Sequence, residues 1–357
     1  MNPFLFRQFR KLETKVHELN YLFWECTQRC NLSCRHCGSD CFSSAKDLDM
    51  PLDVFLKALD TIPNPLANKS SSAKNSTHIV VLTGGEPLLR PDIEQIGKEI
   101  SKRGYYWSMV SNGFFYTEEM NKKLMAAGLK ALTFSLDGIG DTHNWMRGNP
   151  KSYEHTIKAI EIAAREKRLD FDVVSCINRR SIGQLEEIYQ TLKSLGARKW
   201  RLFTIIPIGR AKDDPDMHLT NEEMLRLMDF IAEKRKERGP LDVTFSCEGY
   251  LGRYEEKVRP VRHFCHAGIN IASVLIDGRI CACPNIDRDV FSQGNIYTDN
   301  LYEVWENKFQ EFRNRDWARK GICSGCKQFK NCFGGGMHNW HGDCAQTLSC
   351  HYHRLGH

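Results

Sequence analysis

The chain has 357 residues, of which 41% are hydrophobic and 26% are charged, and its formal net charge is +6. These values are ordinary for a globular protein and leave room for one large domain and a smaller one. No basic stripe is interleaved with aromatic residues, so we expect no nucleic-acid partner.

No apolar run approaches the roughly 20 residues that a membrane-spanning helix needs, and the first residues lack the apolar segment of a signal peptide. The chain nevertheless holds 15 cysteines. Disulfide frameworks are typical of small exported domains, and an odd count leaves one cysteine unpaired. We therefore expect a cytoplasmic protein that uses its cysteines for metal or cluster ligation.

Residues 1–20 are predicted to be an N-terminal extension. Apolar residues such as Phe6 and Phe9 stand among Arg7, Arg10 and Lys11 in an amphipathic pattern. Such a segment can dock on a partner or on a membrane surface. We expect it to pack on the barrel that follows. We also expect it to be too short for a domain that binds a peptide leader.

From residue 21 to residue 240, short apolar or β-branched runs alternate with helix-like segments. The predicted strands are Leu22–Glu25, His78–Leu82, Trp107–Val110, Ala131–Ser135, Asp172–Cys176 and Trp200–Ile205. The predicted helices are Leu52–Thr61, Ile93–Arg103, Glu118–Ala127, Tyr153–Glu166, Ile182–Leu195 and Asn221–Lys236. This order predicts an α/β fold with a parallel sheet, built as a partial (β/α)6 barrel of the TIM type.

Capping residues support several of these helices. Thr117 precedes one predicted helix, and Thr220 with Glu223 forms the Thr-x-x-Glu pattern of a capping box. Glycines follow three helices at positions where a left-handed residue is common: Gly104, Gly128 and Gly196.

Three cysteines follow the first predicted strand with the spacing Cys-x3-Cys-x2-Cys: Cys30, Cys34 and Cys37. Three thiolates in one tight loop suit iron–sulfur ligation. A four-iron cluster with three protein ligands keeps one iron free for a small molecule, which indicates chemistry rather than electron transfer alone.

The second predicted strand leads into Gly84, Gly85, Glu86 and Pro87. Two glycines let the backbone approach a ligand closely, and the glutamate can accept hydrogen bonds from a ligand ammonium group. A simple turn at the end of a strand is the alternative for this loop.

Together, the cysteine triad and the Gly-Gly-Glu-Pro loop make the chain resemble the radical S-adenosylmethionine (SAM) enzymes. The resemblance covers roughly residues 21–210. It implies a four-iron cluster on the triad, with SAM bound to it and its methionyl amine on the Gly-Gly-Glu-Pro loop. It also implies reductive cleavage of SAM to a 5′-deoxyadenosyl radical, which takes a hydrogen atom from the substrate.

The same resemblance places further SAM contacts at Ser111, Asn112 and Ser135, where the family holds the ribose and the methionyl carboxylate. Arg147 falls where relatives place an arginine on that carboxylate, and a bidentate guanidinium–carboxylate pair explains such a contact. Surface positions or strand-end hydroxyls are the alternatives. We expect Asp137 to belong to a turn rather than to contact the ligand.

Residues 241–357 are rich in cysteine, glycine and histidine and are predicted to form a second domain that folds around metal centres. The pattern is similar to the SPASM domain, which carries auxiliary four-iron clusters. Matching positions are Cys265, Gly278, Cys283, Cys323, Cys326 and Cys332, with a late cysteine. Gly336 departs from the pattern because the family has a cysteine there.

Eight cysteines after residue 261 permit two auxiliary four-iron clusters. The first is assigned Cys265, Cys281, Cys283 and Cys344. The second is assigned Cys323, Cys326, Cys332 and Cys350. The places of Cys281, Cys344 and Cys350 stay open, as does a cluster with three protein ligands at Gly336. Structural zinc sites are the alternative for this half of the chain.

Relatives that join such a barrel to a SPASM domain mostly modify peptides or proteins. The resemblance therefore implies a peptide or protein substrate that is crosslinked, oxidised or epimerised. It also implies an electron donor such as flavodoxin or ferredoxin, and either direct peptide binding or a separate leader-binding protein. The alternatives are maturation of sulfatases, disfavoured because the nearest acid after Cys283 is Asp287, and a non-catalytic cluster or zinc protein. The catalytic acid or base is not predicted.

Overall fold

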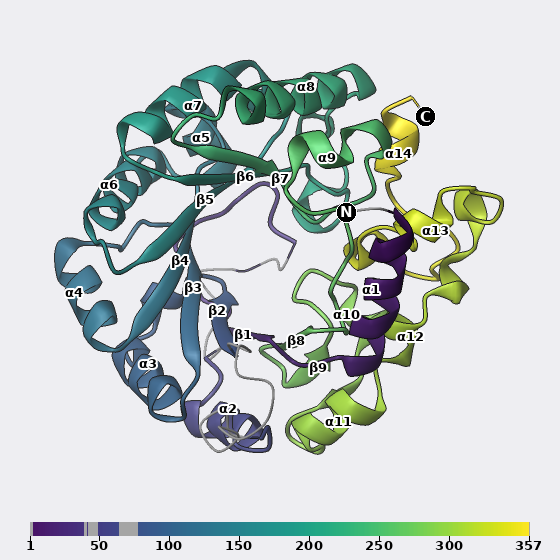
Figure 1. Cartoon of the computed structure of the whole chain (residues 1–357). Helices are drawn as coiled ribbons and strands as arrows, with labels where there is room; N and C mark the ends of the chain where they lie inside the picture. Colours follow the sequence, from purple (N-terminus) through teal and green to yellow (C-terminus); the bar gives the residue numbers. More distant parts are fainter. Residues whose placement is uncertain (1–2, 39–40, 42–48, 64–77, 357) are drawn as a thin grey trace.

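The computed structural model describes residues 3–38, 41, 49–63 and 78–356. Its barrel is a curved parallel sheet whose helices cover the outer face (Figure 1). The barrel strands are β1 (Tyr21–Thr27), β2 (Ile79–Gly84), β3 (Tyr106–Ser111), β4 (Leu129–Ser135), β5 (Asp170–Cys176), β6 (Lys199–Phe203) and β7 (Asp242–Phe245). The outer helices are α2 (Leu52–Leu59), α3 (Ile93–Lys102), α4 (Glu118–Ala126), α5 (Asp141–Arg147), α6 (Ser152–Arg165), α7 (Leu185–Ser194) and α8 (Asn221–Glu237).

The alternation of strands and helices predicted from the sequence is confirmed. Thr117 accepts a hydrogen bond from the backbone of Met120, and both bonds of the capping box at Thr220 are present. The three glycines after helices all have positive φ angles. The predicted helix Ile182–Leu195 begins as a 3₁₀ turn, η2 (Ser181–Gln184), which α7 continues.

Two strands beyond residue 240 extend the barrel sheet. β7 pairs in parallel with β6, and β8 (Ile271–Val274) pairs in parallel with β1. The sheet then continues through the antiparallel strands β9 (Arg279–Cys281) and β10 (Gly294–Asn295). The sheet therefore runs across residue 240, and the division between two domains at that point stays a prediction.

The C-terminal segment lies across the open side of the curved sheet (Figure 1). Its helices are short: α9 (Glu255–Val258), α10 (Arg288–Phe291), α11 (Leu301–Asn307), α12 (Gln310–Arg313), α13 (Phe329–Cys332) and α14 (His351–Arg354). Loops and 3₁₀ turns join them, among them η8 (Met337–Asn339). Large aromatic side chains, including those of Trp305, Phe309 and Phe312, are fully buried between them.

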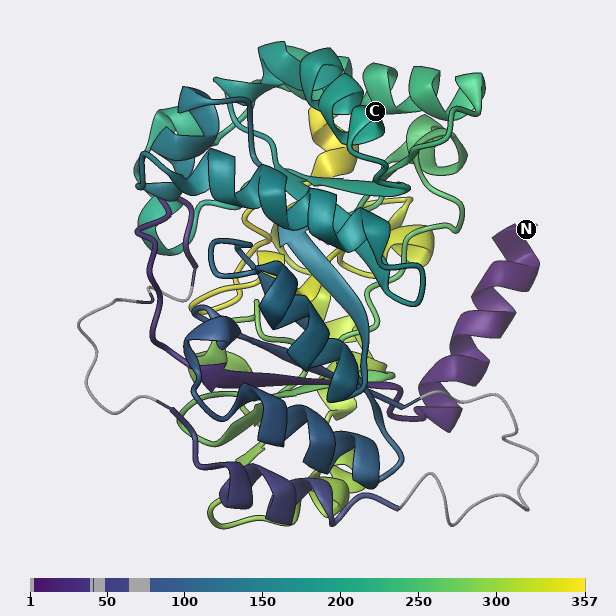
Figure 2. The ribbon, with the colours of Figure 1, turned by 90° about the vertical axis from the view of Figure 1, so that its left-hand side faces the viewer.

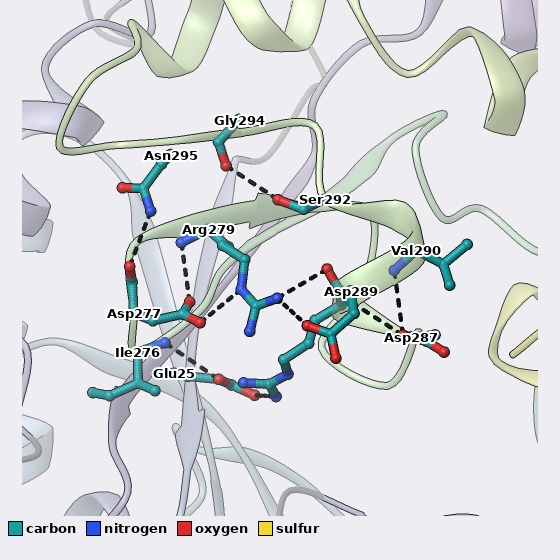
Figure 3. Close-up of polar contacts among 11 residues, drawn as sticks. Glu25, Ile276, Asp277, Arg279, Asp287, Asp289, Val290, Ser292, Gly294 and Asn295 are labelled. Carbon is teal, nitrogen blue, oxygen red and sulfur yellow. Dashed lines mark hydrogen bonds and ion pairs between the residues drawn. The ribbon is translucent and has the colours of Figure 1, made fainter. Parts of the chain in front are cut away.

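A buried glutamate ties the β8–β9 hairpin to the first barrel strand (Figure 3). Glu25 of β1 accepts hydrogen bonds from the backbone of Ile276 at 3.3 Å and from the Arg288 guanidinium at 3.1 Å. Burial raises the pKa of Glu25, although Arg288 opposes this. The segment that holds Cys281 and Cys283 is therefore fixed against the strand that leads to the cysteine triad.

The N-terminal helix α1 (Pro3–Val16) stands at the edge of the molecule (Figure 2). Phe6 packs with Phe264 and Ile269, and the Arg10 guanidinium lies 3.8 Å from the centre of the Phe264 ring. The predicted packing on the barrel is therefore wrong for these side chains, which contact the C-terminal segment. Among the described helices, none is long and apolar enough to cross a membrane.

Candidate active site

The cysteine triad lies in a loop at the carboxyl end of β1. Cys30, Cys34 and Cys37 gather in one cluster with Leu32 and Cys41. Burial raises the pKa of the Cys30 thiol to about 11. The structure thus brings the predicted thiols together, and Cys41 is buried beside them.

Arg210 fixes this loop from across the barrel. Its guanidinium donates to the carbonyl oxygens of Cys34 at 3.1 Å and of Cys41 at 2.8 Å. Its backbone N–H donates to the carbonyl of Cys37 at 3.3 Å. The loop after β6 therefore supports the loop after β1, as expected when parallel strands end on the same rim.

Gly84 and Gly85 let the second strand-end loop touch the cysteine loop. A Cβ atom at Gly84 would stand 2.1 Å from the carbonyl oxygen of Thr27, and one at Gly85 would stand 2.1 Å from that of Arg29. The close approach that the two glycines predict is therefore made, in this structure, to the backbone of the triad loop.

Glu86 is fully buried and accepts three hydrogen bonds. One carboxylate oxygen accepts from the Ser111 hydroxyl at 2.9 Å and from the backbone of Leu88 at 3.1 Å. The other accepts from the backbone of Asn112 at 2.7 Å. Burial raises the pKa of Glu86 to about 7, and these donors oppose that shift.

The other predicted SAM contacts also lie at the barrel rim. Ser111, Asn112 and Ser135 end or follow β3 and β4 and are all buried. The amide of Asn112 donates to the side chain of Asn31 in the cysteine loop at 2.9 Å. Hydrogen bonds thus tie Asn112 directly, and Ser111 through Glu86, to the cysteine loop, while the contacts of these residues and of Ser135 with a ligand stay predictions.

Arg147, at the end of α5, lies beside the triad. Its guanidinium forms an ion pair with Asp137 at 2.6 Å and lies 3.7 Å from the sulfur of Cys34. Burial alone would lower the pKa of Arg147, but Asp137 and Cys34 hold it above its ordinary value. The pKa of Asp137 stays below its usual range because Arg147 and His36 outweigh the effect of burial.

Sequence reasoning missed part of this cluster. Ligand atoms of His36, Asp137 and Cys176 lie within 4.8 Å of one another. Burial lowers the pKa of His36 to about 4, so the imidazole is neutral near pH 7. The sequence predicted a turn at Asp137 and placed Cys176 only at the end of a strand. Their positions at the ends of β4 and β5 were the signal that could have found them.

A cavity of about 480 Å³ lies between the barrel rim and the C-terminal segment. His36, Cys37 and Cys176 line it from the barrel, and Cys283 and His338 line it from the other side. Much of its wall is apolar, with contributions from Phe203, Ile205, Ile206, Ile208, Pro284 and Ile286. The cavity connects the triad with the predicted auxiliary-cluster residues.

The cysteines assigned to the second auxiliary cluster converge. Cys323, Cys332 and Cys350 line one small cavity behind the first. The pKa of the Cys332 thiol is raised to about 12 by burial and by the neighbouring thiols of Cys350, Cys323 and Cys326. This set agrees with the assignment from spacing, and its ligand role stays a prediction.

The set assigned to the first auxiliary cluster converges only in part. Burial raises the pKa of the Cys283 thiol, and the thiols that add to this shift are, in decreasing order, those of Cys265, Cys247 and Cys281. Burial raises the pKa of the Cys344 thiol. The charged groups with the largest further effect on it are Lys320, Asp287, Asp343 and Glu311, none of which is a thiol. Cys247, which the sequence assignment omitted, lines the large cavity together with Cys283.

Two buried arginines test whether these thiols suit clusters. Guanidinium N–H groups of Arg259 and Arg315 are buried without a hydrogen-bond partner among the described residues. Burial lowers the pKa of both guanidinium groups; Cys265 and Cys332 oppose this shift at Arg315, and Glu255 and Cys247 oppose it at Arg259. An anionic, thiolate-ligated cluster supplies the negative charge that such cations need, whereas a neutral zinc site with two thiolates and two imidazoles does not.

Comparison with known families agrees with this arrangement. The sequence profile of the Radical SAM superfamily matches residues 24–192, and that of the SPASM iron–sulfur cluster-binding domain matches residues 265–327. The chain is a radical SAM enzyme with a C-terminal SPASM domain. It therefore uses SAM and a [4Fe-4S] cluster, and its SPASM domain binds auxiliary iron–sulfur clusters.

Two proteins with different named activities are similar in sequence to this radical SAM enzyme. The chain is 27% identical to the AdoMet-dependent heme synthase of Methanosarcina barkeri, over 87% of this chain and 89% of that protein. It is 28% identical to the mycofactocin maturase MftC of Mycobacterium tuberculosis, over 94% of this chain and 82% of that protein.

Solved structures share the fold. Streptococcus suis SuiB bound to precursor peptide SuiA has a TM-score of 0.70 at 15% identity, covering 96% of this chain and 78% of SuiB. Native anSMEcpe with bound AdoMet and the Cp18Cys peptide has a TM-score of 0.71 at 20% identity, covering 94% of each chain. The α/β partial barrel with a SPASM domain is therefore confirmed.

Proposed function

We propose that this radical SAM enzyme abstracts a hydrogen atom from a peptide or protein and so starts its oxidation, crosslinking or epimerisation. The large cavity between the triad and the SPASM domain carries the proposal. SAM bound to the triad cluster supplies the 5′-deoxyadenosyl radical. The residues of this chain hold the substrate at the cavity and exclude water from it.

The charge of the cavity wall favours a peptide over a tetrapyrrole, the second candidate suggested by the heme synthases. Haem carries carboxylates, and a site for them needs free cationic side chains. Arg288 is the one arginine or lysine among the described residues that line the cavity, and it is paired with Glu25. The apolar isoleucine wall suits side chains of a peptide.

Formylglycine formation of the sulfatase-maturase kind is less well supported. Asp287, the nearest acid after Cys283, does line the cavity. However, one oxygen of Asp287 accepts hydrogen bonds from the backbone N–H groups of Asp289 and Val290. The other accepts one from the backbone N–H of Gly342 and lies 3.3 Å from Nδ1 of His341. Because these contacts occupy both oxygens, Asp287 is poorly suited to accept a substrate proton.

The remaining partners follow from this function. A flavodoxin or ferredoxin is proposed to reduce the triad cluster in the cytoplasm, where thiols stay reduced. A separate leader-binding protein is proposed to present the peptide, or the cavity binds it directly. Two auxiliary four-iron clusters are proposed because Cys350 completes one set of four thiols and a second set surrounds Cys283.

Anaerobic turnover with two substrate classes tests the proposal. Reconstituted, dithionite-reduced protein is incubated with SAM and with either a library of synthetic peptides or iron-coproporphyrin III. We expect 5′-deoxyadenosine and a mass change or deuterium uptake in a peptide. The Cys30/Cys34/Cys37→Ala variant, which lacks the triad, should give neither. Decarboxylation of the porphyrin without any peptide product would overturn the proposal in favour of the second candidate.

A further inference from the structure

The chain departs from the SPASM pattern at Gly336, where the pattern has a cysteine. A residue with a side chain does not fit there. A Cβ atom at 336 would stand 2.6 Å from the carbonyl oxygen of Glu248 and 2.5 Å from the His338 ring. The glycine therefore leaves room that another side chain of this chain fills.

That side chain is His338, on the 3₁₀ turn η8. Its Nε2 atom lies 3.0 Å from the position of a Cβ at 336, which is the region where the family's cysteine side chain would begin. The same Nε2 atom is buried without a hydrogen-bond partner among the described residues. A buried ring nitrogen without a partner points to a missing ligand, because such groups are nearly always satisfied.

The cysteines of the site lie next to this turn. The backbone N–H of Met337, the neighbour of His338, donates to the sulfur of Cys265 at 3.5 Å. Cys283 lines the same cavity as His338. One cysteine of the family pattern therefore contacts the turn that carries His338, and another lines the cavity that His338 lines.

Cys247 provides a third thiol. It follows β7, and its side chain is open to the cavity although its neighbours Ser246 and Glu248 are buried. Burial and the neighbouring Cys265 raise the pKa of the Cys247 thiol, and Cys247 contributes to the raised pKa of Cys283. Cys247 faces the same cavity as Cys283 and His338, whereas Cys344 lies among Lys320 and acidic groups.

We propose that the first auxiliary cluster is held by three thiolates and one imidazole: Cys247, Cys265, Cys283 and His338. The proposal rests on the binding of auxiliary clusters by the SPASM domain but not on the identity of the substrate. A neutral imidazole in place of a thiolate makes a cluster less negative, and imidazole ligation raises the reduction potential of iron–sulfur centres. The cluster nearest the cavity would then accept an electron from a substrate radical more readily.

The experiment uses the full chain with the Cys30/Cys34/Cys37→Ala changes, so that only auxiliary clusters form. The protein is reconstituted anaerobically with iron and sulfide, with and without nitrogen-15-labelled histidine. Pulsed electron paramagnetic resonance of the reduced protein measures nitrogen coupling to the clusters, and iron analysis measures their number. His338→Ala, His338→Cys and Cys247→Ala are compared with Cys281→Ala and Cys344→Ala as matched controls.

We expect a histidine nitrogen coupling in the parent protein and in both control variants. It should vanish in His338→Cys, which keeps its iron and shifts to a more negative potential, and Cys247→Ala should lose up to half of the iron. No nitrogen coupling in the parent, coupling that survives in His338→Cys, or iron loss from Cys344→Ala but not from Cys247→Ala would each overturn the proposal. A parent without iron would contradict auxiliary clusters altogether, independently of the peptide assay.

Discussion

The backbone N–H of Asn112 donates to the buried carboxylate of Glu86 at 2.7 Å and so joins the loops that follow β2 and β3. These two loops carry most of the predicted SAM contacts. A change in the charge of Glu86 therefore alters the hydrogen bonds that hold both loops.

SAM binding should depend on pH through Glu86. Burial raises its pKa to about 7 from an ordinary value of 4.5, so the carboxyl is mostly neutral at pH 6 and charged at pH 8. Only the charged form attracts the methionyl ammonium group, so SAM should bind severalfold more tightly at pH 8 than at pH 6. Isothermal titration calorimetry of anaerobic protein measures this.

Glu86→Gln serves as the control for that experiment. Its affinity for SAM should be weaker and independent of pH in the same range. The same raised pKa predicts that stability contributed by neutral Glu86 is present below pH 4.5 and is lost as pH rises through about 7. A pH dependence that persists unchanged in Glu86→Gln would assign it to another group.

Replacement of Arg147 by Met should lower the stability of the protein by roughly 3 kcal/mol or more, because it leaves Asp137 buried without its ion-pair partner. The double variant Arg147→Met, Asp137→Asn should recover much of this loss. Urea unfolding of the two variants measures the difference. Equal stability of the single and double variants would contradict the role of the pair.

Gly85→Ala should displace the cysteine loop, because the new Cβ would stand 2.1 Å from the carbonyl oxygen of Arg29. We expect a cost on the order of 3 kcal/mol and a weaker hold on the triad cluster. Iron content and thermal unfolding measure both effects. Gly183→Ala is the matched control, since a Cβ there meets no atom within 4 Å.

Arg288→Met should weaken the attachment of the β8–β9 hairpin, and of Cys283 after it, to the barrel. It removes the donor to buried Glu25 at 3.1 Å and leaves a buried carboxylate, at a cost of roughly 3 kcal/mol. Arg262→Met, which breaks an ion pair with exposed Glu256, should cost less than about 1 kcal/mol. Denaturant unfolding of both variants tests the contrast, and similar losses would refute it.

Iron removal should destabilise the C-terminal segment more than the barrel. Without clusters, buried Arg259 and Arg315 keep N–H groups that lack partners. Hydrogen exchange after anaerobic chelation should therefore rise first around these residues and later in β2 to β5. Uniform protection with and without iron would count against clusters at these thiols.

Most of the barrel could be predicted because its first six strands are short apolar or β-branched runs and several helices carry a cap or a terminal glycine. The capping box of Thr220 and Glu223 was visible in four residues of sequence. The hairpin of β8 and β9 could not be found this way, because strands of four and three residues are too short to show a period.

The site was predicted as far as its motifs are local. The cysteine triad lies in one short segment and Glu86 in another, and the two segments meet as expected. The ion pair of Asp137 with Arg147 and the neighbourhood of Cys247 and Cys265 could not be predicted, because only the folded chain brings these partners together. In the sequence His338 is one of several histidines near the C-terminal cysteines, and it stands out only in the folded chain, where its ring lies beside Gly336.

β1 has parallel neighbours on both sides, β2 of the barrel and β8 of the SPASM half. A hinge between the two halves would have to break backbone hydrogen bonds along the strand that ends at the triad. Relative rotation of the halves is therefore an expensive way to admit a substrate. Entry and exit must depend on rearrangement of the loops around the rim, while the distance between the triad loop and the β8–β9 hairpin stays constant.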